Sequence, residues 1–205
     1  VRPLAWCSRP RSSAALPEGA HVITLVYETH STSTDNEAGI ATGWLEGRLS
    51  GRGRQQAEAL GERRRRDGIA GVYTSDLARA VETAQIAFSG SRIPVREDAR
   101  LRECNYGELN GRPVGEIDAV RLDHVDEPFP GGESYRDVVE RTRLFLADLP
   151  EELEGARIVL IAHSANRWAL EHLLAGKDLH ELVAAPFEWQ EGWIYRLDPG
   201  QDPQG

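Results

Sequence analysis

The segment that most constrains the fold is RIVLIA at Arg157–Ala162, in which every residue after the arginine is apolar. A short run of this kind, rich in β-branched residues, is typical of a strand buried on both faces of a sheet. The chain passes from it directly into His163 and then into a helical pattern over residues 166–174, which Gly176 closes. Strands that lead straight into helices are the units of parallel sheets, so the segment predicts an α/β fold.

The same alternation of strands and helices runs through the rest of the chain. Apolar, β-branched runs predict strands at residues 21–27, 69–74, 93–96 and 193–197. Helical spacing of apolar residues predicts helices at residues 53–66 with Ser50 as N-cap, at 77–88 with Ser75 as N-cap, and at 133–149. This order predicts a three-layer α/β/α sandwich with a mostly parallel central sheet.

Length and composition fit one domain. With 205 residues, of which 40% are hydrophobic, the chain is large enough for one sizeable core, which we place in residues 21–198. Residues 1–20 are rich in proline, serine and arginine without a period, which predicts a poorly ordered N-terminal arm, and residues 199–205 are expected to form a C-terminal tail. Arginine supplies nearly all the cations, which is typical of a GC-rich, bacterial genome.

Charge and hydropathy argue against several kinds of partner. The net charge of −9 disfavours a nucleic-acid partner, and the one basic cluster, residues 63–66, is interpreted as a solvated helix terminus. Because no apolar run is long enough to cross a membrane and residues 1–20 lack the apolar core of a secretory signal, we expect no membrane partner and a cytoplasmic location. Cys7 and Cys104 show no metal-binding spacing and are expected to stay reduced.

Two histidines stand where predicted strands end. His30 follows the strand at residues 21–27, and His163 follows RIVLIA directly. Ligands of open α/β sheets bind outside the carboxyl ends of the strands, so both are candidate site residues, with Arg79 and Glu103 at comparable positions. Ordinary structural interpretations remain: Arg79 could pair with a neighbouring acid such as Glu82, and Glu103 could be a solvated loop acid.

Five motifs resemble those of the histidine phosphatase (phosphoglycerate mutase-like) superfamily. They are HSTSTDNEAG at residues 30–39, against the family signature R-H-G-x-T-x-x-N, SDLARAVETA at 75–84, LRECNYGELNG at 101–111, PGGES at 130–134 and IAHSA at 161–165. One such motif is a weak signal, whereas five in family order are a specific one. The resemblance implies a phosphoglycerate mutase-like sandwich and a phosphohydrolase that acts on small phosphorylated substrates.

The resemblance also assigns roles to the candidate residues. His30 is the nucleophile that forms a phosphohistidine. Arg79 and His163 hold the phosphoryl group, and the Asn36 amide and the backbone N–H of Ser164 add donors, unless Asn36 is only a turn residue.

Glu103 is the counterpart of the family's general acid and base. The implied activity is a phosphomonoester hydrolase that needs neither metal nor cofactor. A zinc site built from His30, His163 and Glu103 is an alternative, since these residue types suit zinc. Mutase activity would need a strongly positive site, so hydrolysis is the preferred interpretation.

The sequence departs from the family signature at Thr29, which stands where the signature has the arginine before the nucleophile. Glu28 precedes it and adds a negative charge that would repel a dianion. Three interpretations follow. The hydroxyls of residues 31–34 replace the arginine in a phosphatase; or the substrate is less charged or different, with Thr29 and Glu28 among its contacts; or the chain is a non-catalytic protein that binds a ligand or partner.

Two further regions carry expectations. Residues 112–129, with His124 among five acids, are predicted to form a helix and a lid over the site. The aromatic residues near the C-terminus are expected to belong to the core or to a homodimer face, with a platform for stacking a ring-bearing substrate as the alternative. They are Phe187, Trp189, Trp193 and Tyr195.

Overall fold

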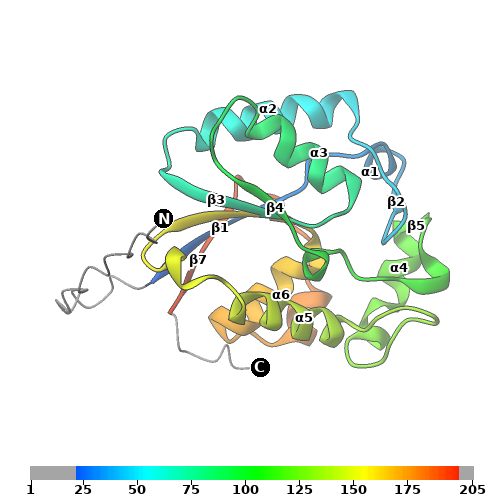
Figure 1. The fold of residues 1–205 in the computed structure, drawn as a ribbon. Helices are drawn as coiled ribbons and strands as arrows, with labels where there is room; N and C mark the ends of the chain where they lie inside the picture. The colour runs from blue at the N-terminus through cyan, green and yellow to red at the C-terminus, as the bar shows by residue number, and fades with distance from the viewer. Residues whose placement is uncertain (1–21, 199–205) are drawn as a thin grey trace, which may run out of the picture.

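The computed structural model describes residues 22–198, which form a sheet covered by helices on both faces (Figure 1). The strand order is β4-β3-β6-β1-β7. Four of these strands are mutually parallel, namely β1 (Ile23–Thr29), β3 (Ile69–Thr74), β4 (Val95–Glu97) and β6 (Arg157–Ala162). The edge strand β7 (Trp193–Leu197) runs antiparallel to β1. The mostly parallel sheet is as predicted.

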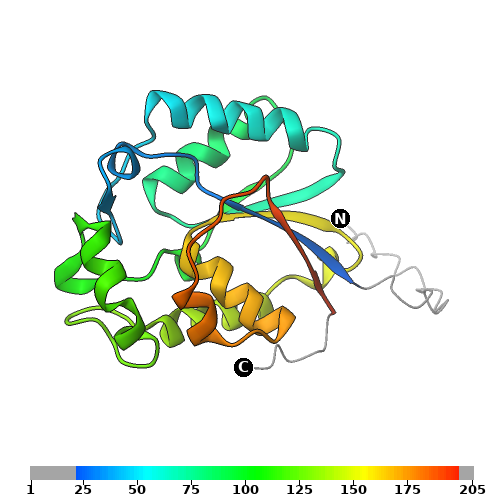
Figure 2. The same ribbon diagram turned by 180° about the vertical axis from the view of Figure 1, so that it is seen from behind.

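The helices form two outer layers. In Figures 1 and 2, α2 (Gly51–Arg64) and α3 (Ala78–Ala87) lie on one face, and α5 (Tyr135–Ala147) and α6 (Ser164–Ala175) on the other. The short helix α7 (Leu179–Ala184) contacts α6. At one end of the sheet lie α1 (Thr34–Glu37), α4 (Val114–Val120) and a small sheet of β2 (Ile40–Ala41) with β5 (Arg112–Pro113). The predicted three-layer sandwich is confirmed.

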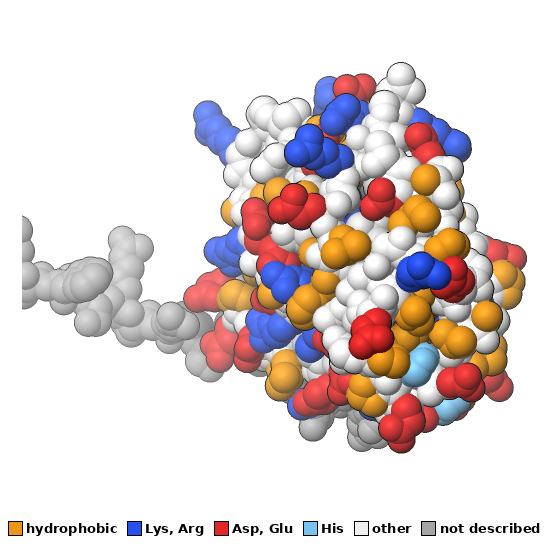
Figure 3. Space-filling model, turned by 90° about the vertical axis from the view of Figure 1, so that its right-hand side faces the viewer, with side chains coloured by type: hydrophobic (Ala, Val, Ile, Leu, Met, Phe, Trp, Pro, Cys, Tyr) orange, Lys and Arg blue, Asp and Glu red, His pale blue; other side chains and the backbone are white. Residues whose placement is uncertain are grey.

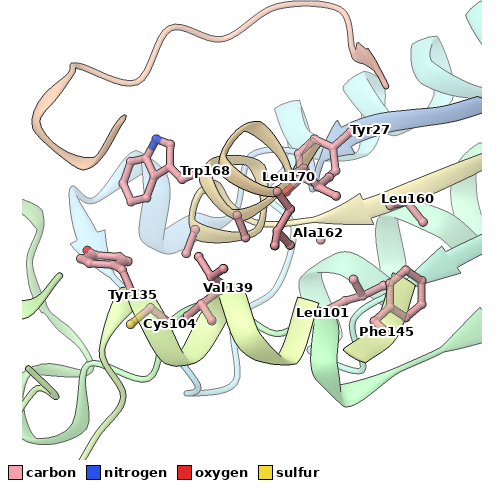
Figure 4. Packing of buried hydrophobic residues seen from close by; sticks show 14 of the residues in the cluster. Tyr27, Leu101, Cys104, Tyr135, Val139, Phe145, Leu160, Ala162, Trp168 and Leu170 are labelled. Atoms are coloured by element: carbon pink, nitrogen blue, oxygen red, sulfur yellow. The ribbon is translucent and has the colours of Figure 1, made fainter. Parts of the chain in front are cut away.

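The core divides along the central strand β6. Ile158, Leu160 and Ala162 belong to the larger cluster, between the sheet and α5 and α6, part of which is drawn in Figure 4. Val159 and Ile161 belong to the smaller cluster under α2 and α3. Because successive side chains of a strand point to opposite faces, one apolar strand feeds both clusters. Burying each such side chain contributes roughly 1.5–3 kcal/mol, which fixes β6 at the centre of the sheet.

Several predicted boundaries differ from the structure. The bounds of β3, β6 and β7 are those predicted, but β1 runs to Thr29 because its ladder with β6 extends to the pair Thr29 and Ala162. The prediction that Ser75 caps the helix after β3 is wrong. The N-cap of α3 is Leu77, which makes no side-chain cap, while the Ser75 hydroxyl contacts His163.

Some predictions fall outside residues 22–198. The N-terminal arm at residues 1–20, the tail at 199–205 and Cys7 all do, so the domain boundaries stay predictions. Cys104 is a buried free thiol. No helix in the described part of the chain is long and apolar enough to span a membrane.

Candidate active site

The ends of β1 and β6 bring two histidines together. The backbone N–H of His30 donates to the carbonyl of Ala162 at 2.9 Å, which continues the ladder between the two strands. The rings of His30 and His163 therefore lie with their centroids 5.0 Å apart. The parallel pairing of β1 with β6 places both imidazoles at the same edge of the sheet.

His30 has one ring nitrogen available for chemistry. Its Nδ1 lies 2.8 Å from the carbonyl of Ser31, and because a carbonyl only accepts, Nδ1 carries the proton. The lone pair is then on Nε2, which accepts a hydrogen bond of 3.3 Å from Nε of Arg79. Burial, with the Arg79 charge beside the ring, lowers the pKa of His30 to about 3. At neutral pH the ring is an uncharged nucleophile.

Arg79 is a buried cation that no carboxylate pairs with in the described chain. Its side chain donates to the carbonyls of Gly43 at 2.8 Å and Leu45 at 3.4 Å, and Nη2 lies 3.4 Å from Nδ1 of His163. No ion pair of Arg79 occurs within residues 22–198, and its pKa is lowered by burial. The surface pairing considered for it is wrong, because Glu82 pairs with Arg54 instead. An unpaired buried charge is costly, so the site favours an anion.

His163 is held by groups from two strands. Its Nε2 lies 2.7 Å from Oγ of Ser75, which follows β3, and its carbonyl accepts a hydrogen bond from the hydroxyl of Tyr27 on β1. Burial first, and then the Arg79 charge, hold its pKa well below the usual value. The ring is therefore neutral at neutral pH. A hydroxyl can donate or accept, so Ser75 supports either tautomer of His163.

Glu103 is enclosed between two loops. Its Oε1 accepts from the backbone N–H groups of Cys104 at 2.8 Å and Ala165 at 3.2 Å, and Trp44 Nε1 donates to its carbonyl at 2.7 Å. The residue is 8% exposed, so its interpretation as a solvated acid is wrong. Burial raises the pKa of this carboxyl group above its usual value, which suits a proton donor.

The two additional donor candidates lie in the first turns of helices. Asn36 Oδ1 accepts from the backbone N–H and the hydroxyl of Ser33, each at 3.0 Å, in the capping box of α1. This leaves the amide NH₂ of Asn36 for a ligand. Ser164 opens α6, where the first backbone N–H groups have no partner inside the helix. Both residues line the hollows described below.

Glu28 does not present a free charge to the site. It is 2% exposed, and its carboxylate accepts from Arg64 Nε at 2.8 Å and Nη2 at 2.6 Å and from Arg63 Nη2 at 3.3 Å. The interpretation of residues 63–66 as a solvated helix terminus is therefore wrong for these two arginines. Two guanidinium groups neutralise Glu28, which removes the expected repulsion of a dianion.

Two hollows meet at the nucleophile. The α2-side hollow, of about 600 Å³, lies between the end of β1, one face of α2 and the segment after α7. The lid-side hollow, of about 180 Å³, contains Arg79 and Glu103. The α2-side hollow is lined by Thr29, Arg52, Gln56, Ala59, Leu60, Arg63 and Trp189, among others. Both hollows are lined by His30, Asn36, Ser164 and Phe187.

The predicted lid lies over the smaller hollow. Within residues 112–129, Val114, Ile117, Asp118 and Arg121 line the lid-side hollow. Figure 3 faces this end of the molecule, where acidic, basic and apolar side chains are intermixed. Asp118 pairs with Arg121 at 3.2 Å, so this acid does not face the hollow as an unpaired charge.

The aromatic residues near the C-terminus divide between core and surface. Trp193 and Tyr195 on β7 are buried, as expected. Trp189 is 60% exposed on the α2-side hollow, which agrees with the alternative of a stacking platform for this residue alone.

Sequence reasoning missed several residues that position the site. Thr83 on α3 accepts from the backbone N–H of Ser31 at 3.0 Å and donates to the carbonyl of Arg79 at 2.7 Å, so it ties the nucleophile loop to the cation. Arg141 on α5 holds the carbonyl of Glu103 at 2.9 Å. These contacts join segments that are far apart in the sequence, so no local sequence pattern predicts them. Among the described residues no group of three His, Cys, Asp or Glu side chains could hold a metal ion, so His30, His163 and Glu103 do not form one.

Related sequences and structures are known. The model of the histidine phosphatase superfamily (branch 1) matches residues 29–202. The probable phosphoglycerate mutase GpmB of Salmonella paratyphi B is 33% identical over 136 residues, 62% of this chain and 63% of the relative. The match thus spans less than two thirds of that relative's length.

Two solved structures agree in fold. YhfR of Bacillus stearothermophilus has a TM-score of 0.72 and 28% identity over 82% of this chain and 88% of its own. A mycobacterial glucosyl-3-phosphoglycerate phosphatase, solved with VO₃, has a TM-score of 0.69 and 28% identity over the same shares of the two chains.

Proposed function

This chain belongs to the histidine phosphatase superfamily, and we propose that it is a metal-independent phosphomonoester hydrolase that acts through a phosphohistidine on His30. The observation that carries the proposal is the environment of Arg79. Its guanidinium is buried without a carboxylate partner in the described chain, 3.3 Å from the nucleophilic nitrogen of His30. A phosphoryl group bound there would pair with the guanidinium and would also lie next to the nucleophilic nitrogen.

In the first half-reaction, Nε2 of His30 attacks the phosphorus atom in line with the leaving oxygen. A P–N bond forms, the P–O bond to the alcohol breaks, and the leaving alkoxide takes a proton from Glu103. Arg79 and His163 bind the equatorial oxygens, with the Asn36 amide and the Ser164 backbone N–H as further donors.

In the second half-reaction, the Glu103 carboxylate accepts a proton from water. The water oxygen attacks phosphorus, the P–N bond breaks, and His30 recovers its lone pair as inorganic phosphate forms. The raised pKa of Glu103, caused by its burial, supports the first step, because it favours the protonated form that donates to the leaving group.

The charge of the site supports hydrolysis of small phosphate esters over mutase chemistry. Within the described chain, Arg79 is the cation that contacts His30, since both histidines are neutral at neutral pH and Thr29 replaces the signature arginine. The hydroxyls of residues 31–34 are the nearest substitutes in the sequence. Loss of one charged hydrogen bond, about 1.5–3 kcal/mol, would slow the chemistry by roughly ten- to a hundredfold.

A screen of phosphate esters tests the proposal. The panel contains 4-nitrophenyl phosphate, 3-phosphoglycerate and glucosyl-3-phosphoglycerate, because the relatives are named for the latter two chemistries. With excess chelator present, we expect turnover of at least one ester by the wild type and none by His30→Ala. A folded protein that turns over no ester would instead indicate a non-catalytic ligand- or partner-binding protein or a substrate outside the phosphate esters.

A further inference from the structure

The space around His30 is larger than a phosphomonoester needs. The lid-side hollow alone contains Arg79 and Glu103, the groups that bind the phosphoryl oxygens and protonate the leaving group in the proposed reaction. The α2-side hollow, about 600 Å³, opens on the other side of the same nucleophile and contains neither. A phosphoryl group at His30 therefore lies between two spaces. The leaving group of the monoester departs into the lid-side hollow, whereas His163, which lines the α2-side hollow, binds only the phosphoryl oxygens.

Thr29 lies where the larger hollow reaches the nucleophile. It is the last residue of β1, adjoins His30 and lines the α2-side hollow. An arginine here would extend a long side chain into that space, as the family signature prescribes, whereas threonine ends close to the backbone. The position that would bind a phosphoryl oxygen is thus left open for a substituent on that oxygen.

The positive charge near His30 also suits a phosphoryl group with one negative charge better than one with two. In the described chain Arg79 is the unpaired, buried cation in contact with His30, and the lid residue Arg121 is paired with Asp118 at 3.2 Å. In the α2-side hollow, Arg63 contacts Glu28 at 3.3 Å, and Arg52, which makes no ion pair in the described chain, is exposed to solvent. A monoester carries up to two negative charges at neutral pH and a diester carries one, so a single buried guanidinium balances the diester.

The walls of the α2-side hollow suit an organic group. Ala59 and Leu60 on α2 and Phe187 after α7 give it apolar surface, Gln56 adds a polar contact, and the exposed Trp189 offers a free ring face at the rim. Concave, mostly apolar sites of this size are typical of small-molecule binding, and an exposed tryptophan stacks readily on planar rings.

We propose that the α2-side hollow holds the second alcohol of a phosphodiester, so that the enzyme cleaves diesters with a ring-bearing substituent as well as monoesters. This inference rests on the proposed function of His30. For a diester RO–PO₂⁻–OR′, Nε2 forms the P–N bond and the P–OR bond breaks. RO⁻ takes the proton of Glu103 in the lid-side hollow, while R′ stays in the α2-side hollow.

The second step releases a monoester. Glu103 takes a proton from water, the water oxygen bonds to phosphorus, and the P–N bond breaks with its electron pair returning to His30. The product R′O–phosphate still carries the R′ group, in contrast to the inorganic phosphate formed from a monoester. The order of products is therefore diagnostic of the diester reaction.

The test compares bis(4-nitrophenyl) phosphate with 4-nitrophenyl phosphate on the full chain. We expect the wild type to cleave both, with 4-nitrophenyl phosphate as the first phosphorylated product of the diester, and His30→Ala to cleave neither. In Thr29→Arg the new side chain fills the opening, so kcat/KM for the diester should fall at least tenfold while that for the monoester rises. Thr29→Val, which stays short, should keep the wild-type ratio of the two.

The outcomes separate the two proposals. Cleavage of the monoester but not of the diester by the wild type would overturn the diester inference and leave the proposed function standing. The diester inference is overturned in the same way if Thr29→Arg changes both activities in the same direction. No cleavage of either ester would overturn the proposed function and the inference with it. Should Thr29→Arg fail to fold, Trp189→Ala replaces it, and an unchanged diester-to-monoester ratio would overturn the inference.

Discussion

The hydroxyl of Ser75 lies 2.7 Å from Nε2 of His163, so a serine placed like a helix cap instead orients a buried imidazole. In the proposed reaction the opposite ring nitrogen of His163 faces the phosphoryl oxygens. The state of that nitrogen depends on the proton that Nε2 and the hydroxyl share. Ser75 is therefore a positioning residue for the site.

Ser75→Ala is expected to lower kcat about tenfold with little change in KM, because the ring loses its fixed orientation while Arg79 still binds substrate. Leaving Nε2 unpaired in the interior should also lower the free energy of unfolding by about 1–3 kcal/mol. Steady-state kinetics and urea unfolding measure the two effects. Ser91→Ala, at an exposed serine, is the matched control. A rise in KM at constant kcat would contradict the assignment.

Glu103→Gln is expected to affect substrates according to their leaving groups. An alkyl alcohol leaves as a basic alkoxide and needs the proton of Glu103, whereas 4-nitrophenolate leaves without one. The loss in kcat should therefore be much larger for an alkyl phosphate than for 4-nitrophenyl phosphate. Equal losses on both esters would show that Glu103 does not protonate the leaving group.

The two histidines should make the fold sensitive to mild acid. Their pKa values are lowered in the folded state, that of His30 to about 3 from 6.5, so the unfolded chain binds protons first as the pH falls. Their contribution to stability is complete above pH 6.5 and is lost as the pH falls toward the folded pKa, at up to about 1.4 kcal/mol per pH unit and group. Between pH 7 and pH 5, the free energy of unfolding measured in urea should fall less in His30→Gln than in the wild type. Equal falls in the free energy of unfolding would contradict the lowered pKa of His30.

The buried ion pairs of Glu28 are expected to contribute strongly to the free energy of unfolding. Removing one partner of a buried ion pair costs about 3–5 kcal/mol, and since Arg64 keeps a second partner in Asp67, we expect about 3 kcal/mol for Glu28→Gln. The control is Glu62→Gln, which breaks the exposed pair of Glu62 with Arg65 and should cost under about 1 kcal/mol. Equal costs in urea unfolding would mean that the Glu28 pair is no more than a surface contact.

The sequence predicted the parts of the fold that rest on local pattern. The apolar strands β3 and β6 have the predicted bounds because continuous β-branched runs leave few alternatives. The end of β1 was placed too early, since its last residues are polar and are held as a strand only by pairing with β6. Strand pairing between distant segments is not visible in a local window.

In the candidate site, too, local motifs predicted some residues and long-range contacts were missed. The positions of His30, Arg79 and His163 followed from motifs at strand and helix ends, and the structure brings these three together. The pairing of Glu28 with Arg64 was missed because the two residues are 36 positions apart and the cluster had the appearance of a solvated helix end. Long-range ion pairs depend on packing that composition does not encode.

In the proposed reaction His30 carries the phosphoryl group, and trapping this phosphohistidine is the direct experiment. The enzyme is mixed with the ester it turns over and quenched in alkali, in which phosphohistidine survives, and the peptide containing His30 is analysed by mass spectrometry. We expect a phosphoryl group on His30 that is lost in acid and is absent from His30→Ala. Turnover by the wild type with the phosphoryl group on another residue, or undiminished turnover by His30→Ala, would contradict it.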